Sequence, residues 1–200
     1  MQLLQTVQKI DKHIAYIYYL KGIIFKETGD TVKAIENFQI AIDKEPDFYN
    51  IHILLGKIYA DRNDSIAIAY YKNAIRIIPG SIEAHYDLGI YYQEAGRAAD
   101  AINEYEYIIE NIDSAYPYAY HNIGFIYMEH FCNFEKAIAY FDKSAMLAPD
   151  YVEAVYHRGL CYETMQQYEK ARADYRRTLD IVPNYRYGID GLNRIDDKLH

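Results

Sequence analysis

The side chains with the most chemical potential in this sequence are His121, His157 and a short run that holds Glu129, His130 and Cys132. If the two imidazoles lie on adjacent helices, they could share a metal ion. A protein zinc site takes three or four ligands, and no third ligand is defined here, so packing residues are the simpler interpretation. Glu129, His130 and Cys132 include a base and a nucleophile, but neighbours along a turn do not make a catalytic geometry.

Motifs of established catalytic chemistry are missing from the chain. It has no glycine-rich phosphate loop, no His-Glu-x-x-His and no Cys-x-x-Cys. Cys132 and Cys161 are too few for a disulfide framework. Each falls within a helical pattern, where we expect a small buried hydrophobic side chain. We therefore expect no enzyme, no cofactor and no metal site.

The composition is that of a globular protein with an unusual aromatic content. Apolar residues make up 51% of the chain and charged residues 25%, and 24 tyrosines stand against 7 phenylalanines and no tryptophan. A tyrosine ring packs in a core while its hydroxyl reaches water, which suits thin layers of structure. The net charge is −8 and the cations are scattered, so we expect no nucleic-acid partner.

The sequence gives few indications of a compartment. No stretch approaches about 18 consecutive apolar residues, so we expect no membrane insertion. Met1 to Asp11 lacks the basic and apolar regions of a signal peptide. A cytoplasmic location is the default expectation, and a periplasmic or surface-attached one stays open if the chain is part of a longer protein.

The elements that must position these side chains are set by an internal repeat. Three kinds of residue keep one register through five cycles of about 34 residues. Glycines recur at Gly22, Gly56, Gly89, Gly124 and Gly159. Alanines that precede an aromatic residue by four recur as Ala34–Phe38, Ala67–Tyr71, Ala101–Tyr105, Ala137–Phe141 and Ala171–Tyr175. Prolines follow twelve residues after the alanine in four units, at Pro46, Pro79, Pro149 and Pro183.

This pattern resembles the tetratricopeptide repeat, with Gly-x-x-Tyr, then Ala-x-x-x-Phe, then Pro. The resemblance covers roughly residues 15 to 185. Two departures from the family pattern recur. The family's tryptophan four residues before the glycine is replaced by Tyr18, His52, His85, Tyr120 and Val155. The usual leucine before the glycine is replaced in two units by Lys21 and Arg158.

The resemblance implies an all-α fold, an α-α superhelix of about five antiparallel helical hairpins with a capping helix. We expect the glycine and the alanine to allow close approach of helices, and each proline to end a unit. One residue more than the period requires falls before Pro117, and we place it in the loop between units. The expected divisions are an N-terminal extension of the first helix (1–14), five repeats (15–48, 49–81, 82–116, 117–151 and 152–185) and a C-terminal capping helix (186–200).

In this family the first helix of each repeat lines a concave groove that binds peptides. Carrying the groove positions onto this sequence gives a surface rich in aromatic and acidic side chains, with few cations. The candidate contacts are Tyr16, Tyr19, Ile23, Asn50, Ile53, Lys57, Glu83, Tyr86, Asp87, Ile90, Tyr118, His121, Asn122, Phe125, Glu153, Tyr156, His157 and Leu160.

This surface favours a non-catalytic module that binds a protein or peptide segment of basic or mixed apolar and basic character. A clamp for a chaperone's C-terminal carboxylate is not expected, because Glu83 and Asp87 stand where the clamp needs cations. The alternative is a structural or self-associating spacer in a larger assembly. The apolar first helix, around Ile14, Ile17 and Leu20, could pair with a second copy if it lacks a cap. The partner itself stays unidentified.

Overall fold

The computed structural model describes the backbone of residues 2–199 and the side chains of residues 10–196 and of Lys198. The described chain contains helices and no strand, which confirms the predicted all-α fold class. The helices are α1 (Gln2–Glu27), α2 (Thr31–Lys44), α3 (Tyr49–Ala60), α4 (Ile66–Ile77), α5 (Ile82–Glu94), α6 (Ala98–Tyr107), η1 (Ile108–Ile112), α7 (Pro117–Glu129), α8 (Phe134–Leu147), α9 (Val152–Thr164), α10 (Tyr168–Ile181) and α11 (Arg186–Leu199). None of the described helices is long and apolar enough to cross a membrane.

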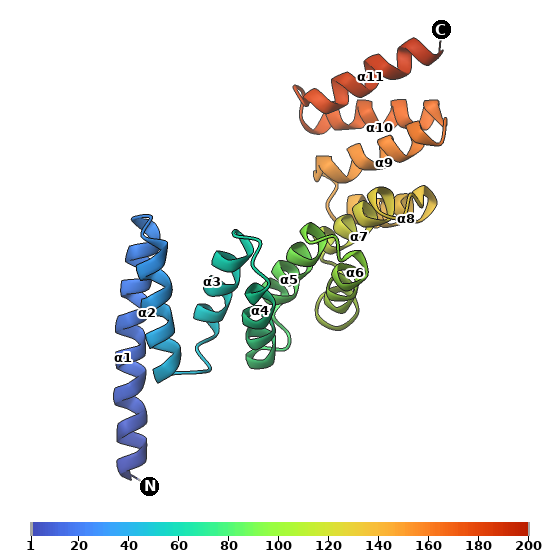
Figure 1. Ribbon diagram of the computed structural model, residues 1–200. Helices are drawn as coiled ribbons and strands as arrows, with labels where there is room; N and C mark the ends of the chain where they lie inside the picture. Colours follow the sequence, from blue (N-terminus) through green and yellow to red (C-terminus); the bar gives the residue numbers. More distant parts are fainter. Residues whose placement is uncertain (1, 200) are drawn as a thin grey trace. The chain divides into compact units, whose positions relative to one another are not determined.

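The chain forms two compact units, Met1–Tyr91 and Tyr92–His200. In the first unit, α1 packs along α2 and α3 along α4 (Figure 1). In the second unit, α7 packs along α8, α9 along α10, and α11 covers the free side of α10 (Figure 1). Consecutive helices are therefore antiparallel hairpins within each unit.

In the hairpins that begin with α1, α3, α7 and α9, a glycine on the first helix lies against an aromatic ring on the second. A Cβ atom added to Gly22 would lie 2.4 Å from the Phe38 ring, and one added to Gly56 would lie 2.6 Å from the Tyr71 ring. Phe38 is fully buried, and Tyr71 is 2% exposed. The glycine therefore makes room for a ring of its own hairpin, and this ring contact explains why the two residue types recur together.

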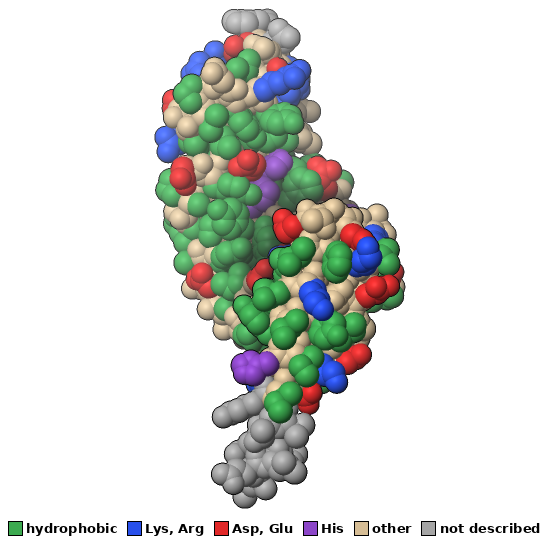
Figure 2. Space-filling model, turned by 90° about the vertical axis from the view of Figure 1, so that its left-hand side faces the viewer, with side chains coloured by type: hydrophobic (Ala, Val, Ile, Leu, Met, Phe, Trp, Pro, Cys, Tyr) green, Lys and Arg blue, Asp and Glu red, His purple; other side chains and the backbone are tan. Residues whose placement is uncertain are grey.

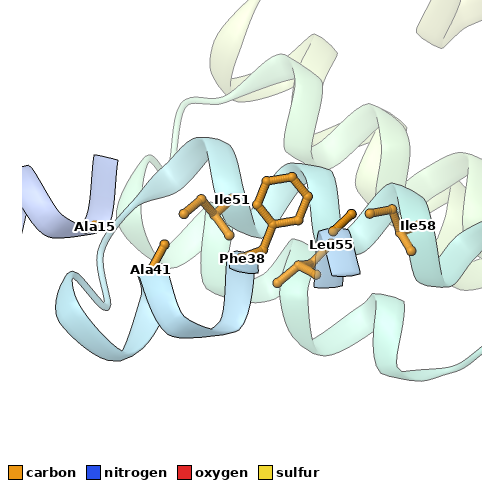
Figure 3. Close-up of a cluster of buried hydrophobic side chains, with 7 residues drawn as sticks. Ala15, Phe38, Ala41, Ile51, Leu55 and Ile58 are labelled. Atoms are coloured by element: carbon orange, nitrogen blue, oxygen red, sulfur yellow. The ribbon is translucent and has the colours of Figure 1, made fainter. Parts of the chain in front are cut away.

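Within each unit, neighbouring hairpins share clusters of buried hydrophobic side chains, and Figure 3 shows one in the first unit. Ala15 of α1 and Phe38 and Ala41 of α2 pack with Ile51 and Leu55 of α3. All five are fully buried. A single hairpin cannot bury such a face by itself, so the next hairpin must cover it.

The turn inside each hairpin contains one residue in the left-handed backbone region. Two of the five turns use glycine there, and the other three do not. The residues are Gly29, Asn63, Gly96, Cys132 and Gln166, with φ of 83°, 53°, 71°, 49° and 58°. In the last turn the Gln167 N–H donates to the Tyr162 carbonyl at 2.8 Å, the bonding of a helix that ends in a left-handed residue.

Three of the five tryptophan replacements hydrogen-bond to the loop before their repeat. The imidazole of His52 bonds to the Pro46 carbonyl at 2.7 Å, and that of His85 bonds to the Pro79 carbonyl at 3.1 Å. The Tyr120 hydroxyl donates to the Ser114 carbonyl at 3.1 Å. In all three cases the carbonyl lies six residues before the side chain. A hydrogen bond from the imidazole or the tyrosine hydroxyl therefore holds the loop at the position where the family has a tryptophan ring.

The extra residue before Pro117 lies in a helix and not in the loop where we expected it. Helix α6 continues into η1, a π-helical turn, and the Asp113 N–H donates to the Ile108 carbonyl at 2.8 Å. A π turn holds one more residue than an α turn at little change in the path of the chain. The insertion is therefore absorbed before the helix ends.

Helix α11 covers the last hairpin. Ile195 is fully buried, and a Cβ atom on Gly191 would lie 2.7 Å from the Tyr175 ring. Arg172 of α10 pairs with Asp196 at 3.1 Å. The exposed side of α11 carries Arg186, Asp190, Asn193 and Arg194, as suits a cap, together with Tyr187 and Ile189. The last two residues of the predicted cap, 199 and 200, lie outside the described side chains.

Candidate protein-binding surface

The two histidines of the sequence analysis meet in the structure. His121 Nε2 lies 3.0 Å from His157 Nδ1, which joins α7 to α9. His121 Nδ1 lies 3.1 Å from Asn122 Oδ1, an atom that can only accept, so His121 carries its proton on Nδ1. Neutral His121 then has a bare Nε2, and His157 Nδ1–H donates to it. This arrangement needs an unprotonated Nε2 on His121.

The surroundings keep the pair neutral. Burial lowers the pKa of His121, although the Asn122 contact and the charge of Glu153 oppose the shift. Burial and the neighbouring His121 together lower the pKa of His157 to about 4. No group of three or more potential ligands for a metal ion occurs within the described chain. The geometry supports a hydrogen-bonded packing pair that ties two helices together.

Aromatic rings continue from this pair in both directions along the second unit. The His121 ring lies 5.0 Å from Tyr151, which lies 5.1 Å from Tyr118. The His157 ring lies 5.3 Å from both Phe125 and Tyr156. Beyond Tyr156, the rings of Tyr185 and Tyr187 follow at 5.8 Å and 5.5 Å. We call this set the aromatic stripe, made of Tyr118, His121, Phe125, Tyr151, Tyr156, His157, Tyr185 and Tyr187.

The stripe reaches solvent at both ends. Tyr118 is 44% exposed and Tyr187 is 60% exposed, while His121 at the centre is only 8% exposed. In the upper part of Figure 2, where the C-terminal helices lie, hydrophobic side chains gather around histidine side chains, with acidic side chains beside them. A surface of this kind combines apolar contact area with negative charge.

The predicted groove residues differ in how much surface they offer. Tyr16, Asn50, Glu83 and Tyr118 are exposed. Ile53 and His121 are buried at 4% and 8% exposure, so they support the surface and offer a partner little of it. The remaining twelve are partly exposed: Tyr19, Ile23, Lys57, Tyr86, Asp87, Ile90, Asn122, Phe125, Glu153, Tyr156, His157 and Leu160.

The acidic residues predicted for the first unit are already engaged. Lys57 Nζ lies 2.7 Å from a Glu83 oxygen and 3.2 Å from an Asp87 oxygen. Burial raises the pKa of the Asp87 carboxyl, and the Lys57 charge opposes that rise. One cation thus offsets two carboxylates, so this part of the surface is less acidic than the sequence alone indicates.

A pocket of about 450 Å³ lies where α9 meets α11. Its charged centre is Glu163, which accepts from Arg194 at 2.9 Å and from the Tyr175 hydroxyl at 2.6 Å, with Lys198 at 3.4 Å. These contacts hold the pKa of Glu163 below its usual value despite burial. The pocket's other lining residues are Tyr156, Leu160, Thr164, Gln166 and Tyr168.

Sequence reasoning missed the residues that the capping segment adds to this surface. The predicted divisions place Tyr185 at the end of the fifth repeat and Tyr187, Arg194 and Lys198 in the cap, yet all four contact residues of α9. The alternation of tyrosine and arginine after Pro183 was the available signal. It could not be interpreted without knowing which side of α11 faces α9.

The cysteines differ from each other. Cys161 is buried as expected, and burial raises the pKa of its thiol to about 12, which leaves it unreactive. The expectation for Cys132 is wrong, because this residue is exposed at the left-handed position of the α7–α8 turn. Glu129 and His130 beside it are exposed as well.

These hairpins, with their glycine–ring contacts and regular turns, define a helical-repeat protein. A sequence model described as tetratricopeptide repeat matches residues 117–151, and a second one matches residues 152–185. A solved structure of MamA protein superimposes with a TM-score of 0.75 at 25% identity, over 84% of this chain and 91% of that one. The chain is a tetratricopeptide repeat protein.

Two curated proteins are also similar in sequence. The uncharacterized protein ycf37 of Guillardia theta is 22% identical over 150 residues, which is 73% of this chain and 84% of that protein. The Photosystem I assembly protein Ycf3 of Acaryochloris marina is 30% identical over 108 residues, which is 52% of this chain and 64% of that protein. The match to Ycf3 thus spans less than two thirds of either protein.

Proposed function

We propose that this protein is a non-catalytic interaction module that holds a segment of another protein against the aromatic stripe. The stripe is the observation that carries the proposal. Rings from α7, α9 and α11 meet on one surface, and the His121–His157 bond fixes the first two helices relative to each other. Aromatic side chains on a rigid support are the commonest anchors of protein interfaces.

The chemistry of the partner segment follows from what the surface leaves unsatisfied. Glu153 is partly exposed, and no ion pair to it occurs among the described side chains. Asn122 keeps an amide group at the same surface, which suits a hydrogen bond to an extended backbone. A segment with apolar and basic residues would match these features.

The similarity to a protein named as an assembly factor points in the same direction. The curated relative Ycf3 carries the name of a Photosystem I assembly protein. A role for this chain in holding components during the assembly of a larger complex is therefore the biological setting that we propose. A pocket for catalysis plays no part in such a role.

A photo-crosslinking experiment tests the proposal. p-Benzoylphenylalanine replaces Tyr118, at one end of the stripe, or Met146, which is 63% exposed on α8, in a tagged protein expressed in its source cell. We expect a discrete crosslinked protein from position 118 and not from position 146. Crosslinks from position 146 alone, or equal crosslinks from both, would place the partner elsewhere and overturn the assignment.

Self-association is a second candidate, favoured by the outer side of α1. Ile10, Ile17 and Ile24 are spaced by seven residues and are 53%, 52% and 60% exposed, with Tyr16 and Leu20 beside them. A spacing of seven is that of a helix packing along another helix. Two such faces would together remove about 1,000 Å² from water, the lower limit for a specific interface.

Sedimentation velocity over a range of concentrations decides this candidate. Pairing through α1 predicts a dimer that Ile17→Lys abolishes. The control variant Val32→Lys, at an exposed residue of α2, should leave the dimer intact. A monomer at all concentrations would leave the stripe as the one proposed contact surface.

A further inference from the structure

Three tyrosines at the C-terminal end of the stripe form a compact group, the tyrosine triad of Tyr156, Tyr185 and Tyr187. Their ring centroids lie 5.5 to 5.8 Å apart, and the ring planes cross at 76°, 42° and 62°. Tyr156 comes from α9, Tyr185 from the loop before α11, and Tyr187 from the first turn of α11. Because the ring planes are inclined to one another, the group offers both ring edges and ring faces to a ligand.

A carboxylate lies next to this group. Glu153 lies in the first turn of α9, three residues before Tyr156, so the two side chains share one face of that helix. The charge of Glu153 contributes, after burial, to raising the pKa of Tyr185 to about 12. The face of a tyrosine ring is the negative end of its quadrupole, so rings and carboxylate attract the same kind of group.

Cations of this protein already use other tyrosines in this way. Lys170 Nζ lies 5.2 Å from the Tyr162 ring centre, and Lys198 Nζ lies 5.3 Å from that of Tyr168. Within the described chain, the rings of the triad have no such cation over them. Arg194, the nearest candidate, is held by Glu163 at 2.9 Å.

We propose that the tyrosine triad and Glu153 bind a Lys or Arg side chain of the partner protein. The site rests on the proposed function, because it supplies the basic contact of the segment held against the stripe. Tyr187 forms the exposed wall, at 60% exposure, and Tyr156 forms the floor. Glu153 provides the charge that selects a cation over an apolar side chain of the same length.

The experiment measures binding of small probes to the full chain by NMR. The ring resonances of tyrosine are followed while acetyl-arginine methylamide, acetyl-lysine methylamide or acetyl-norleucine methylamide is added at constant ionic strength. Norleucine has a similar length without the charge. We expect saturable shifts of the triad rings with the arginine or the lysine probe, and much weaker shifts with norleucine.

Variants of exposed residues assign the effect to the triad without disturbing the fold. Tyr187→Leu keeps apolar bulk and loses the quadrupole, and we expect it to weaken binding of the cationic probe about threefold. Tyr187→Phe retains the ring and should bind as the wild type does. Glu153→Gln should weaken binding severalfold at low salt and less at high salt. Phe131→Leu, at a ring that is 51% exposed and lies outside the stripe, is the matched control and should have no effect.

Three results would overturn the site. They are equal shifts with norleucine, wild-type binding by Tyr187→Leu, and the absence of saturable shifts with both cationic probes. None of these removes the proposed function, which depends on the crosslink from position 118. Conversely, crosslinks confined to position 146 would end the proposed function even if the triad binds arginine.

Discussion

His157 donates a hydrogen bond to His121 across 3.0 Å, and this bond exists only while His121 Nε2 carries no proton. A proton on His121 Nε2 would place two N–H groups against each other. The pair also sits among apolar rings, with Phe141 stacked 5.7 Å from His157 and Phe125 at 5.3 Å. The structure therefore links the packing of α7 against α9 to pH.

We expect the free energy of unfolding to fall as the pH drops from 6.5 to about 4. The pKa of His157 is about 4 in the folded chain and about 6.5 when unfolded, so the unfolded state binds more protons in this window. Neutral His157 contributes about 2 to 3 kcal/mol to the free energy of unfolding. This contribution is fully present above pH 6.5 and is lost as the pH falls to about 4. Urea unfolding of the wild type and His157→Gln at pH 7.5 and pH 4.5 measures it. The variant should lose less stability than the wild type, and equal losses would contradict the assignment.

Gly56→Ala should destabilise the first unit. The new Cβ atom would lie 2.6 Å from the Tyr71 ring, which is buried and cannot move aside. Overpacking of this kind costs about 1 to 3 kcal/mol, against about 1 kcal/mol gained in helix propensity. The matched control is Gly80→Ala, where no atom lies within 4 Å of the added Cβ. Thermal unfolding should show a lower midpoint for Gly56→Ala than for Gly80→Ala, and partial recovery in Gly56→Ala with Tyr71→Leu.

Arg158→Leu, which restores the family's usual residue, should destabilise the second unit. The Arg158 guanidinium bonds to Asp174 and to Asp142, and the Asp174 side chain is 8% exposed. Burial raises the pKa of Asp174, and Arg158 opposes that rise. Removing the arginine leaves a buried carboxylate unpaired, at a cost of about 3 kcal/mol. Denaturant unfolding should show this loss, and the double variant Arg158→Leu with Asp174→Leu should recover much of it. A single variant as stable as the wild type would mean that the pair contributes little.

Gln166→Gly should stabilise the last hairpin. Gln166 is exposed and has a φ of 58°, a conformation that costs a residue with a side chain about 1 to 2 kcal/mol more than glycine. Replacing Gln166 by glycine removes this cost, but glycine also has greater backbone freedom in the unfolded state. The expected net stabilisation is about 1 kcal/mol. The control is Ala69→Gly on the exposed side of α4, which should cost about 1 kcal/mol. Calorimetry compares the two, and a fall in midpoint for Gln166→Gly would show that its side chain has a role in the turn.

The sequence by itself determined the helical repeat. Glycine, alanine, the aromatic residues and proline recur because each hairpin must solve the same packing problem, and Gly56 with Tyr71 shows that solution in contact. It also brought His121 and His157 onto adjacent first helices, because they stand three and two residues before the repeat glycines Gly124 and Gly159.

Tertiary structure decided the character of the surface. Lys57 offsets Glu83 and Asp87, and Arg194 offsets Glu163, because side chains distant in sequence converge when hairpins stack. Cys132 is exposed because it takes the left-handed position of the α7–α8 turn, and the extra residue before Pro117 is absorbed by the π turn at η1. Tyr185 and Tyr187 join Tyr156 because α11 covers the last hairpin at one particular rotation. A periodic pattern fixes which residues share a face, whereas partners across faces depend on how rigid helices dock in three dimensions.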